Sequence, residues 1–237
     1  MRIGLFDSGV GGLTVLKTLL KKYPNNEYIY YGDTLNIPYG DKSKEELLEL
    51  ARDNIKFLLT KNVEMIIVAC GTVSSNCLDI LKKENDIPIY SILDTTIDYL
   101  NNSTYENILV MATHATINSH IFKKNVKKNI YELETPKLVP MIENGDYTDL
   151  NKTLHSYLDG YKNKVDALVL GCTHYPIIKD EIKKIINADL VDMSDYIKIN
   201  NDGSTSLKIF FSKIDDKIIN NTKTILNLNN IDINLKQ

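Results

Sequence analysis

A short apolar run that ends in a cysteine reads MIIVACGT, from Met65 to Thr72. Roughly 100 residues further along the chain, a second run of the same kind reads ALVLGCTH, from Ala167 to His174. Each run has four apolar residues, then a small residue and a cysteine, with a threonine close behind. Apolar runs of this length are typical of buried strands, and a repeat at this distance predicts two units of like topology.

Other apolar runs alternate with amphipathic segments along the chain. The stretch Ile3–Ser8 matches Ile108–Thr113 in the same repeat. The pattern as a whole predicts buried strands at Ile3–Phe6, Tyr28–Tyr31, Met65–Ala69, Ile108–Met111, Ile130–Leu133 and Ala167–Leu170. This alternation is typical of parallel sheets covered by helices. We therefore predict an α/β fold of two pseudo-symmetric lobes, each a mostly parallel sheet flanked by helices, with the active site in the cleft between the lobes.

Two helices are clear from the spacing of apolar residues. The first follows Asp41, where Ser43 and Glu46 form a capping box. Its apolar face comprises Leu47, Leu50, Ala51, Ile55, Leu58 and Leu59. The second is predicted after Pro176, because four isoleucines fall on one stripe, namely Ile178, Ile182, Ile185 and Ile186.

The domain boundaries are expected to follow the repeat. We expect the first lobe to comprise residues 1–95 and the second residues 96–199, with the boundary near the polar stretch Asp94–Thr104. A helix at Thr95–Leu100 within that stretch is left open. The C-terminal segment, residues 200–237, holds an apolar run at Leu207–Phe211 and a predicted helix around Asp215–Leu226. We expect this segment to return to the first lobe.

Composition excludes several classes of function. The 237 residues carry a formal charge of −3, so the chain lacks the basic surface that nucleic acid would require. No run approaches the roughly 18 consecutive apolar residues of a membrane helix, and the N-terminus has no signal-peptide pattern. Three widely spaced cysteines, Cys70, Cys77 and Cys172, predict reduced thiols rather than a disulfide framework. We therefore expect a cytoplasmic protein without a nucleic-acid or membrane partner.

The two cysteines of the repeat are candidate catalytic groups. Residues that do chemistry on open parallel sheets lie beyond the carboxyl ends of the strands, where Cys70 and Cys172 are predicted to lie. A thiol at a helix N-terminus commonly has a lowered pKa, so we expect part of each thiol to be ionised at neutral pH. A cleft between the lobes would bring the two thiols to opposite sides of one atom. That arrangement suits stereoinversion at a carbon bearing hydrogen, because one group removes a proton from one face while the other delivers a proton to the opposite face.

Two loops that contain glycine follow the first two strands. The first reads DSGVGG from Asp7 to Gly12 and lets the backbone approach a ligand closely. The second runs from Gly32 to Gly40. Free N–H groups at the helix starts near Ser8, Thr72 and Thr173 are suited to stabilising the charge on a substrate carboxylate.

Asp7 and His174 are candidates for assisting the two thiols, whereas Cys77 is interpreted as an ordinary buried side chain. The spacing Cys172-x-His174 lacks the paired ligands of a zinc site, so we expect no metal. The first glycine loop has no Walker lysine and does not match G-x-G-x-x-G, so we expect no nucleotide cofactor.

Three motifs follow one another in order along the chain. They read FDSGVGGLTV at Phe6–Val15, YGDT followed by PYG within Tyr31–Gly40, and LGCTHYP at Leu170–Pro176. The stretches Ala112–Ser119 and Val139–Gly145 continue the pattern. This combination resembles the glutamate racemases, of the aspartate/glutamate racemase family, from Arg2 to about Ile186.

The resemblance implies a cofactor-independent racemase that converts L-glutamate to D-glutamate for peptidoglycan, and so serves cell-wall biogenesis and cell shape. It implies that Cys70 and Cys172 are the acid and base, with Asp7, Glu143 and His174 as auxiliaries. It also implies substrate contacts at Asp7, Ser8, Pro38, Tyr39, Gly40, Gly71, Thr72, Thr113, Thr116, Thr173 and His174. Neither a metal nor pyridoxal phosphate is implied, and we expect a homodimer.

Two departures from the family pattern stand out. The family typically has Cys-Asn-Thr where this chain has Cys70-Gly71-Thr72. The resemblance implies that the missing amide costs a hydrogen bond to the substrate, worth about 0.5–1.5 kcal/mol. If that loss is a handicap, the substitution Gly71→Asn should improve glutamate turnover. The second departure is the short, Asn-rich region after Asp192, where the family usually carries another helix. We expect this difference to alter the contact between the lobes or the dimer.

Two alternatives remain open at the level of the sequence. A racemase for aspartate or another amino acid would keep both cysteines and differ only in the pocket. A low-activity binding or regulatory protein on the same scaffold is suggested by Gly71. A pure binder, however, has no chemical need for two thiols at these strand ends.

Overall fold

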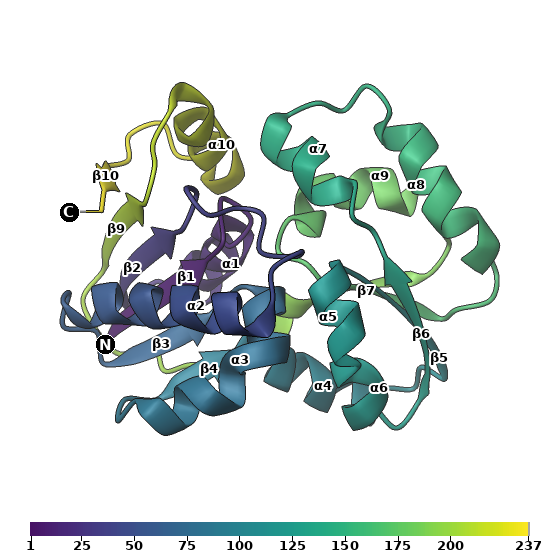
Figure 1. Cartoon of the computed structure of the whole chain (residues 1–237), viewed down its shortest axis with the longest axis horizontal. Helices are drawn as coiled ribbons and strands as arrows, with labels where there is room; N and C mark the ends of the chain where they lie inside the picture. The colour runs from purple at the N-terminus through teal and green to yellow at the C-terminus, as the bar shows by residue number, and fades with distance from the viewer. Residues whose placement is uncertain (237) are drawn as a thin grey trace.

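The first of two parallel sheets contains strands from both ends of the chain (Figure 1). The computed structural model describes residues 1–236. Six strands pair in parallel in the order β10-β9-β2-β1-β3-β4. Their bounds are β1 Arg2–Asp7, β2 Glu27–Gly32, β3 Met65–Val68, β4 Ile89–Ser91, β9 Ser206–Phe211 and β10 Ile233–Leu235. We call this sheet, with the helices packed on it, lobe 1.

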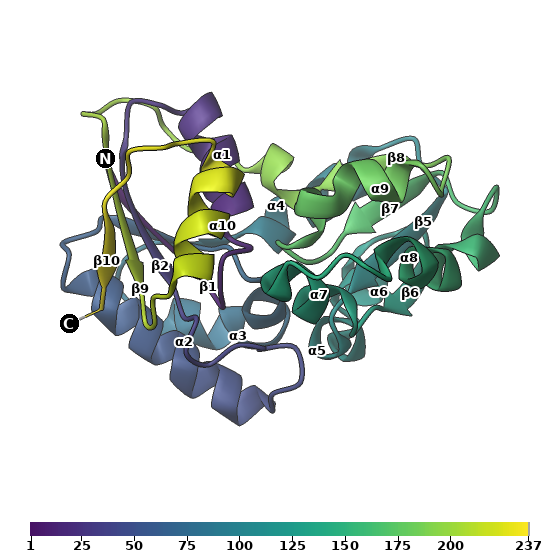
Figure 2. The same cartoon turned by 90° about the horizontal axis from the view of Figure 1, so that it is seen from above.

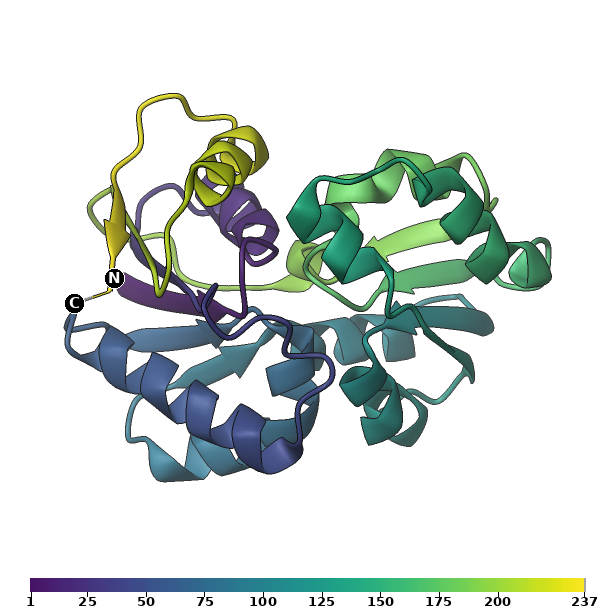
Figure 3. The ribbon, with the colours of Figure 1, turned by 45° about the horizontal axis from the view of Figure 1, so that its top comes forward.

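Helices cover both faces of this sheet (Figure 3). α2 (Lys44–Leu59) and α3 (Gly71–Glu84) pack on one face, and α1 (Leu13–Lys22) and α10 (Asp216–Leu226) pack on the other. The strands are therefore buried on both sides, which explains why β1, β2 and β3 read as nearly continuous apolar runs. The predicted capping box is confirmed at the start of α2, where Ser43 N donates to Glu46 Oε2 at 2.9 Å and Glu46 N donates to Ser43 Oγ at 3.2 Å.

The second sheet is also parallel and has the order β6-β5-β7-β8. Its strands are β5 Asn107–Ala112, β6 Asn129–Glu134, β7 Ala167–Leu170 and β8 Asp189–Asp192. Its helices are α5 His114–Ser119, α6 Ile121–Asn125, α7 Leu138–Asn144, α8 Leu150–Leu158 and α9 Lys179–Lys183, with short 3₁₀ turns at Asp159–Tyr161, Tyr175–Ile178 and Met193–Tyr196. We call this sheet and its helices lobe 2. α4 (Ile92–Asn102) links the two lobes.

The internal repeat is visible in the register of the strands. β1 pairs with β3 so that Ile3 lies opposite Met65, and β5 pairs with β7 so that Ile108 lies opposite Ala167. These are the positions that the sequence repeat superposes. Cys70 and Cys172 therefore follow equivalent strands, one in each lobe.

The two lobes are in direct contact. One hydrophobic cluster runs from Leu13 and Tyr30 in lobe 1 to Val110 and Val169 in lobe 2. Seen from above, α10 lies next to α1, and α7 lies across from them (Figure 2). Lys217 on α10 donates to the side-chain oxygen of Asn144, the last residue of α7, at 2.8 Å. This hydrogen bond adds a polar contact between the lobes, from α10 to α7.

All six predicted strands are present, and the run at Leu207–Phe211 forms β9 beside β2. The sequence did not predict the short edge strands β4, β8 and β10. The predicted boundary stretch Asp94–Thr104 lies mostly in α4, which includes Thr95–Leu100, the segment that the sequence left open as a helix. The division into residues 1–95 and 96–199 remains a prediction. No helix within residues 1–236 is long and apolar enough to cross a membrane.

The helix predicted after Pro176 is shorter than expected. Tyr175–Ile178 forms a 3₁₀ turn, and α9 spans only Lys179–Lys183. The four isoleucines that suggested a long helix are all buried, with exposed fractions between 0% and 6%. Their stripe therefore identified a buried face correctly but not the length of the helix.

Candidate active site

A pocket lies between the lobes, beyond the carboxyl ends of β1, β3, β5 and β7. Its lining comprises Ser8, Pro38, Tyr39, Gly40, Asp41, Cys70, Gly71 and Thr72 from lobe 1, and Thr113, His114, Thr135, Pro136, Val139, Pro140, Gly171, Cys172, Thr173 and His174 from lobe 2. Cys70 and Cys172 are both buried, with exposed fractions of 4% and 8%. The structure therefore brings the two cysteines of the repeat into one pocket, one from each lobe.

Cys70 occupies the N-cap position of α3, directly after β3. Burial raises the pKa of its thiol well above the usual range, and the negative charge of Asp7 adds to this effect. Backbone N–H groups of Val73 and Thr72 act in the opposite direction but are outweighed. The pKa of Cys70 is therefore raised, contrary to the expectation that the helix N-terminus lowers it.

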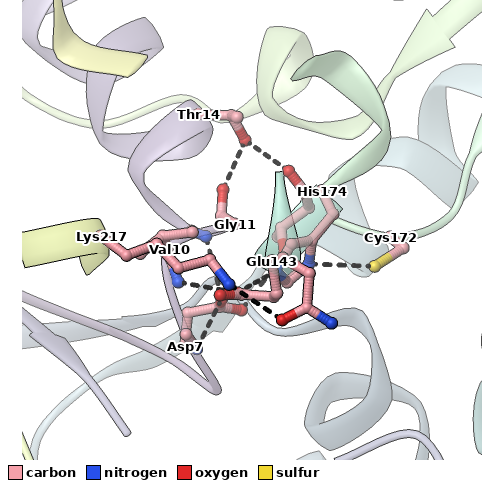
Figure 4. A network of polar contacts seen from close by, with 12 residues as sticks. Asp7, Val10, Gly11, Thr14, Glu143, Cys172, His174 and Lys217 are labelled. Atoms are coloured by element: carbon pink, nitrogen blue, oxygen red, sulfur yellow. Dashed lines mark hydrogen bonds and ion pairs between the residues drawn. The ribbon is translucent and has the colours of Figure 1, made fainter. Parts of the chain in front are cut away.

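Cys172 has a different polar neighbour (Figure 4). His174 Nδ1 lies 3.5 Å from the sulfur of Cys172, and Nε2 of the same ring lies 2.5 Å from Glu143 Oε1. Burial alone would lower the pKa of His174, but its contacts with Cys172 and Glu143 raise this pKa well above the usual range. Burial likewise acts against ionisation of Glu143, yet the hydrogen bond and charge of His174 hold the pKa of Glu143 below its ordinary value. A positively charged His174 is therefore favoured, and it lies against Cys172.

Asp7 connects the glycine loop of lobe 1 to lobe 2 (Figure 4). Its Oδ2 accepts hydrogen bonds from Gly9 N at 3.2 Å and Gly12 N at 2.9 Å. Its Oδ1 accepts one from Thr173 Oγ1 at 3.3 Å. Complete burial raises the pKa of Asp7, while the positive charge of His174 and the two N–H groups limit the rise. Asp7 is thus a buried carboxyl group that holds protons more readily than an exposed one.

Asp7 and Glu143 lie behind the pocket wall rather than in it. Glu143 accepts a hydrogen bond from Val10 N at 3.3 Å, which ties the end of α7 to the glycine loop of lobe 1. Thr116 also lies behind the wall. It accepts a hydrogen bond from Thr113 Oγ1 at 3.0 Å, and Thr113 Oγ1 lies 2.9 Å from Thr72 Oγ1 across the two lobes. Every other predicted site residue lines the pocket.

A hydrogen-bond network holds Tyr39 in the pocket wall. Its hydroxyl donates to Asp33 Oδ2 at 2.6 Å and accepts from Asn54 Nδ2 of α2 at 3.1 Å. All three side chains are buried, with exposed fractions of 1–2%. Asn36 Nδ2 donates to both oxygens of Asp33, at 3.0 and 2.9 Å. The sequence identified Tyr39 but not the partners that fix its position.

Several residues that line the pocket were not predicted, namely Asp41, His114, Thr135, Pro136, Val139, Pro140 and Gly171. Thr135 and Pro136 directly follow β6. The rule that placed the cysteines at strand ends would have found them, because β6 was itself predicted. Within residues 1–236, no three His, Cys, Asp or Glu side chains form a group that could hold a metal ion.

Gly71 has no room for the asparagine that the family pattern has at this position. A Cβ atom at Gly71 would lie 2.8 Å from the carbonyl oxygen of Gly171, closer than real Cβ atoms approach a backbone atom. The conditional expectation that Gly71→Asn improves turnover stays a prediction, and the geometry counts against it, because a Cβ at residue 71 requires the backbone at Gly71 or Gly171 to shift.

The chain is similar to known racemases over almost its whole length. A family model described as Asp/Glu/Hydantoin racemase matches residues 33–196. The glutamate racemase of Aquifex pyrophilus is 37% identical over 227 residues, which cover 90% of this chain and 89% of the relative. A solved structure of glutamate racemase from the same organism has a TM-score of 0.87 at 35% identity, and the match covers 100% of this chain and 98% of that chain.

A second solved structure gives the same result. Glutamate racemase from Francisella tularensis, in complex with D-glutamate, has a TM-score of 0.85 at 32% identity, with coverage of 98% of this chain and 95% of that chain. The family resemblance and the fold class predicted from the sequence are thereby confirmed. The chain belongs to the Asp/Glu/Hydantoin racemase family.

Proposed function

We propose that this enzyme interconverts L-glutamate and D-glutamate without a cofactor, by proton transfer at two cysteines. The observation that carries the proposal is that Cys70 and Cys172, buried after equivalent strands, line one pocket from opposite lobes. The relatives named glutamate racemase support the choice of substrate, as does the F. tularensis structure that contains D-glutamate.

The proposed reaction starts with Cys172 as thiolate and Cys70 as thiol. Cys172 takes the α-proton of one enantiomer and becomes a thiol, while the electron pair of the broken C–H bond stays on the α-carbon. Cys70 gives its own proton to the opposite face of that carbon and becomes a thiolate. One C–H bond breaks and one forms, so no oxidant or reductant is needed. The other enantiomer reacts through the same groups with their roles exchanged.

Three further residues are assigned as positioning residues. The positive charge on His174 stabilises the thiolate of Cys172, and Glu143 holds His174 in its charged form and orientation. Asp7 acts on the other thiol, because its negative charge favours the protonated form of Cys70. The unequal surroundings of the two sulfurs thus provide one base and one acid in the resting enzyme.

The substrate's carboxylates need hydrogen-bond donors, since charge builds up beside the α-carbon when the proton leaves. We assign this role to the hydroxyl groups of Ser8, Thr72, Thr113 and Thr173, all of which line the pocket. Thr116 acts through Thr113, with which it shares a hydrogen bond. The remaining proposed contacts are Pro38, Tyr39, Gly40, Gly71 and His174. Asp7, also predicted as a contact, lies behind the pocket wall and acts through Thr173, whose hydroxyl donates to it.

In the cell, we propose that the product D-glutamate supplies peptidoglycan synthesis and so supports cell-wall biogenesis and cell shape. We also propose that the enzyme is cytoplasmic and homodimeric. Growth of a bacterial strain that requires D-glutamate, after introduction of this gene, tests the first proposal. Light scattering of the purified enzyme, which should give twice the mass of 27.0 kDa, tests the dimer.

The decisive assay uses single enantiomers of glutamate and of aspartate in deuterated water. NMR follows loss of the α-proton signal, and polarimetry follows loss of optical rotation. Exchange and loss of rotation with both enantiomers of glutamate are expected. Preferential turnover of aspartate would favour the alternative that the enzyme is an aspartate racemase. Gly71 motivates this alternative, because it lines the pocket and lacks the amide of the family's asparagine. Absence of exchange with all four substrates would favour a binding protein.

A further inference from the structure

The main chains of the two lobes touch between the two proposed catalytic cysteines. Gly71 directly follows Cys70 and starts α3, and Gly171 directly precedes Cys172 after β7. A Cβ atom at Gly71 would lie 2.8 Å from the carbonyl oxygen of Gly171. The contact therefore exists only because residue 71 has no side chain.

This contact differs from the other places where glycines of lobe 1 face lobe 2. A Cβ at Gly9 would meet the carboxylate of Glu143 at 2.5 Å, and a Cβ at Gly11 would meet the ring of His174 at 2.5 Å. Those atoms belong to side chains rather than to the backbone. At Gly71 the opposing atom belongs to the backbone, so a side-chain rotation cannot relieve the overlap.

Backbone hydrogen bonds hold both partners in the contact. Gly171 N donates to the carbonyl oxygen of Met111 on β5 at 2.8 Å, and a Cβ at Gly171 would lie 2.7 Å from that same oxygen. On the other side, Ser74 N donates to the carbonyl oxygen of Cys70 at 2.9 Å in the first turn of α3. We therefore expect an atom added at residue 71 to act on the spacing of the lobes.

We propose that Gly71 is a positioning residue whose bare Cα lets α3 rest on Gly171 and so sets the distance between the sulfurs of Cys70 and Cys172. The inference rests on the proposed two-cysteine racemisation and adds to it the element that controls its geometry. Inversion requires both sulfurs within reach of one carbon, whereas removal of the α-proton requires only one. A displacement of about 1 Å is enough to slow such a reaction about 100-fold.

The consequence for the reaction is specific. When the lobes are held apart, the thiolate nearer the substrate still takes the α-proton, and its S–H group exchanges with solvent to S–D. With the second thiol out of reach, the deuteron returns to the face from which the proton left. The substrate then gains deuterium without inverting, so isotope exchange outlasts racemisation.

The test compares Gly71→Ala and Gly71→Asn with the unaltered enzyme in deuterated water. We expect the kcat for inversion to fall at least tenfold in Gly71→Ala and further in Gly71→Asn, with a smaller change in KM. Two products are compared: substrate that has gained deuterium without changing configuration, and inverted product. We expect the ratio of the first to the second to rise in the same order. Gly160→Ala is the matched control, because Gly160 is exposed and a Cβ there meets nothing within 4 Å.

Thermal unfolding gives a second readout. Alanine normally stabilises a helix relative to glycine, so a first-turn substitution with open space around it should raise Tm. We expect no rise at residue 71. The isotope ratio is measured on active molecules only, so it remains decisive where a variant is less stable.

The outcomes separate the inference from the proposed function. Unaltered kcat and isotope ratio in Gly71→Ala would overturn the inference, as would an equal loss of exchange and inversion, which signals general damage to the site. Absence of both exchange and inversion in the unaltered enzyme would instead overturn the proposed function.

Discussion

At the scale of single residues, the two cysteines are equivalent in sequence but not in environment. Cys172 lies 3.5 Å from a histidine that Glu143 keeps charged, whereas Cys70 lies near the negative charge of Asp7. The proposed reaction is symmetric about the α-carbon, but the charged groups beside the two sulfurs have opposite sign.

The pair of His174 and Glu143 defines a window of pH. Because the pKa of Glu143 is lowered from 4.5, its charge persists below that value and is lost as the pH falls through the lowered pKa. Because the pKa of His174 is raised above 6.5, its charge persists above that value and is lost as the pH rises through the raised pKa. The ion pair, and the stability it contributes, is therefore present between these two limits.

The substitution Glu143→Gln should lower the pH at which activity declines on the alkaline side. Without the carboxylate, the pKa of His174 falls toward its ordinary value, so the positive charge beside Cys172 is lost at lower pH. We expect kcat at neutral pH to fall by about 100-fold and the alkaline decline of activity to begin at lower pH. Measurement of kcat across pH checks this. Glu106→Gln, which alters a carboxylate that is 77% exposed, is the control, and an unchanged pH profile in Glu143→Gln would contradict the assignment.

The sequence predicted this site unevenly at the residue scale. Cys70 and Cys172 were found because they end repeated strands, and Glu143 was found only through the family resemblance. Asp33 and Asn54 were not found, because hydrogen bonds to one tyrosine from two different elements leave no pattern in the sequence. The raised pKa of Cys70 was also missed, since burial cannot be weighed against a helix N-terminus without coordinates.

At the scale of elements, the loop between β2 and α2 forms part of the pocket wall through Tyr39. That loop has no regular structure from Asp33 to Ser43, so its shape depends on side-chain contacts. The hydroxyl of Tyr39 joins Asp33 in the loop to Asn54 on α2. The network thereby anchors the loop to a helix that is itself capped at Ser43.

The substitution Tyr39→Phe removes that hydroxyl and keeps the ring. Asn54 then loses the acceptor for its buried amide, so we expect the free energy of unfolding to fall by about 1–3 kcal/mol. We also expect KM to rise, because the wall of the pocket is less well held. Urea unfolding and steady-state kinetics measure the two effects. Tyr90→Phe, at a position 50% exposed, should change neither, and equal behaviour of the two variants would refute the role of the network.

How well the sequence predicted an element depends on the burial of its residues. Strands with four or more consecutive buried apolar residues were found, as in β3 and β7. β8 was missed because its sequence DLVD carries a charge at each end and lies at the sheet edge. α9 was predicted too long because its isoleucines remain buried after the helix has ended.

At the scale of the whole molecule, the two lobes share a core as well as a pocket. The hydrophobic cluster that contains Leu13 and Tyr30 continues to Val110 and Val169 in the other lobe. Thr18 Oγ1 and Ser194 Oγ, which lie 2.9 Å apart, add a polar contact beside it. The repeat predicted two lobes, but it carried no information on how closely they pack, because the contacts between them come from single positions such as Gly71.

Continuity of the core predicts that the lobes unfold together. Separating them would expose the shared cluster to water, so a state with one lobe folded should not accumulate. We expect a single transition in urea, coincident by far-UV circular dichroism and by tyrosine fluorescence. Two resolved transitions would contradict the shared core and indicate lobes that are stable on their own.

The central claim is that two thiols act on opposite faces of one carbon. Its most direct test measures deuterium exchange by Cys70→Ser and Cys172→Ser with each enantiomer of glutamate. Each variant keeps one thiol, so we predict exchange of one enantiomer only, the opposite one in the two variants, with inversion abolished in both. Exchange of the same enantiomer by both variants, or inversion at the unaltered rate by either, would contradict the claim.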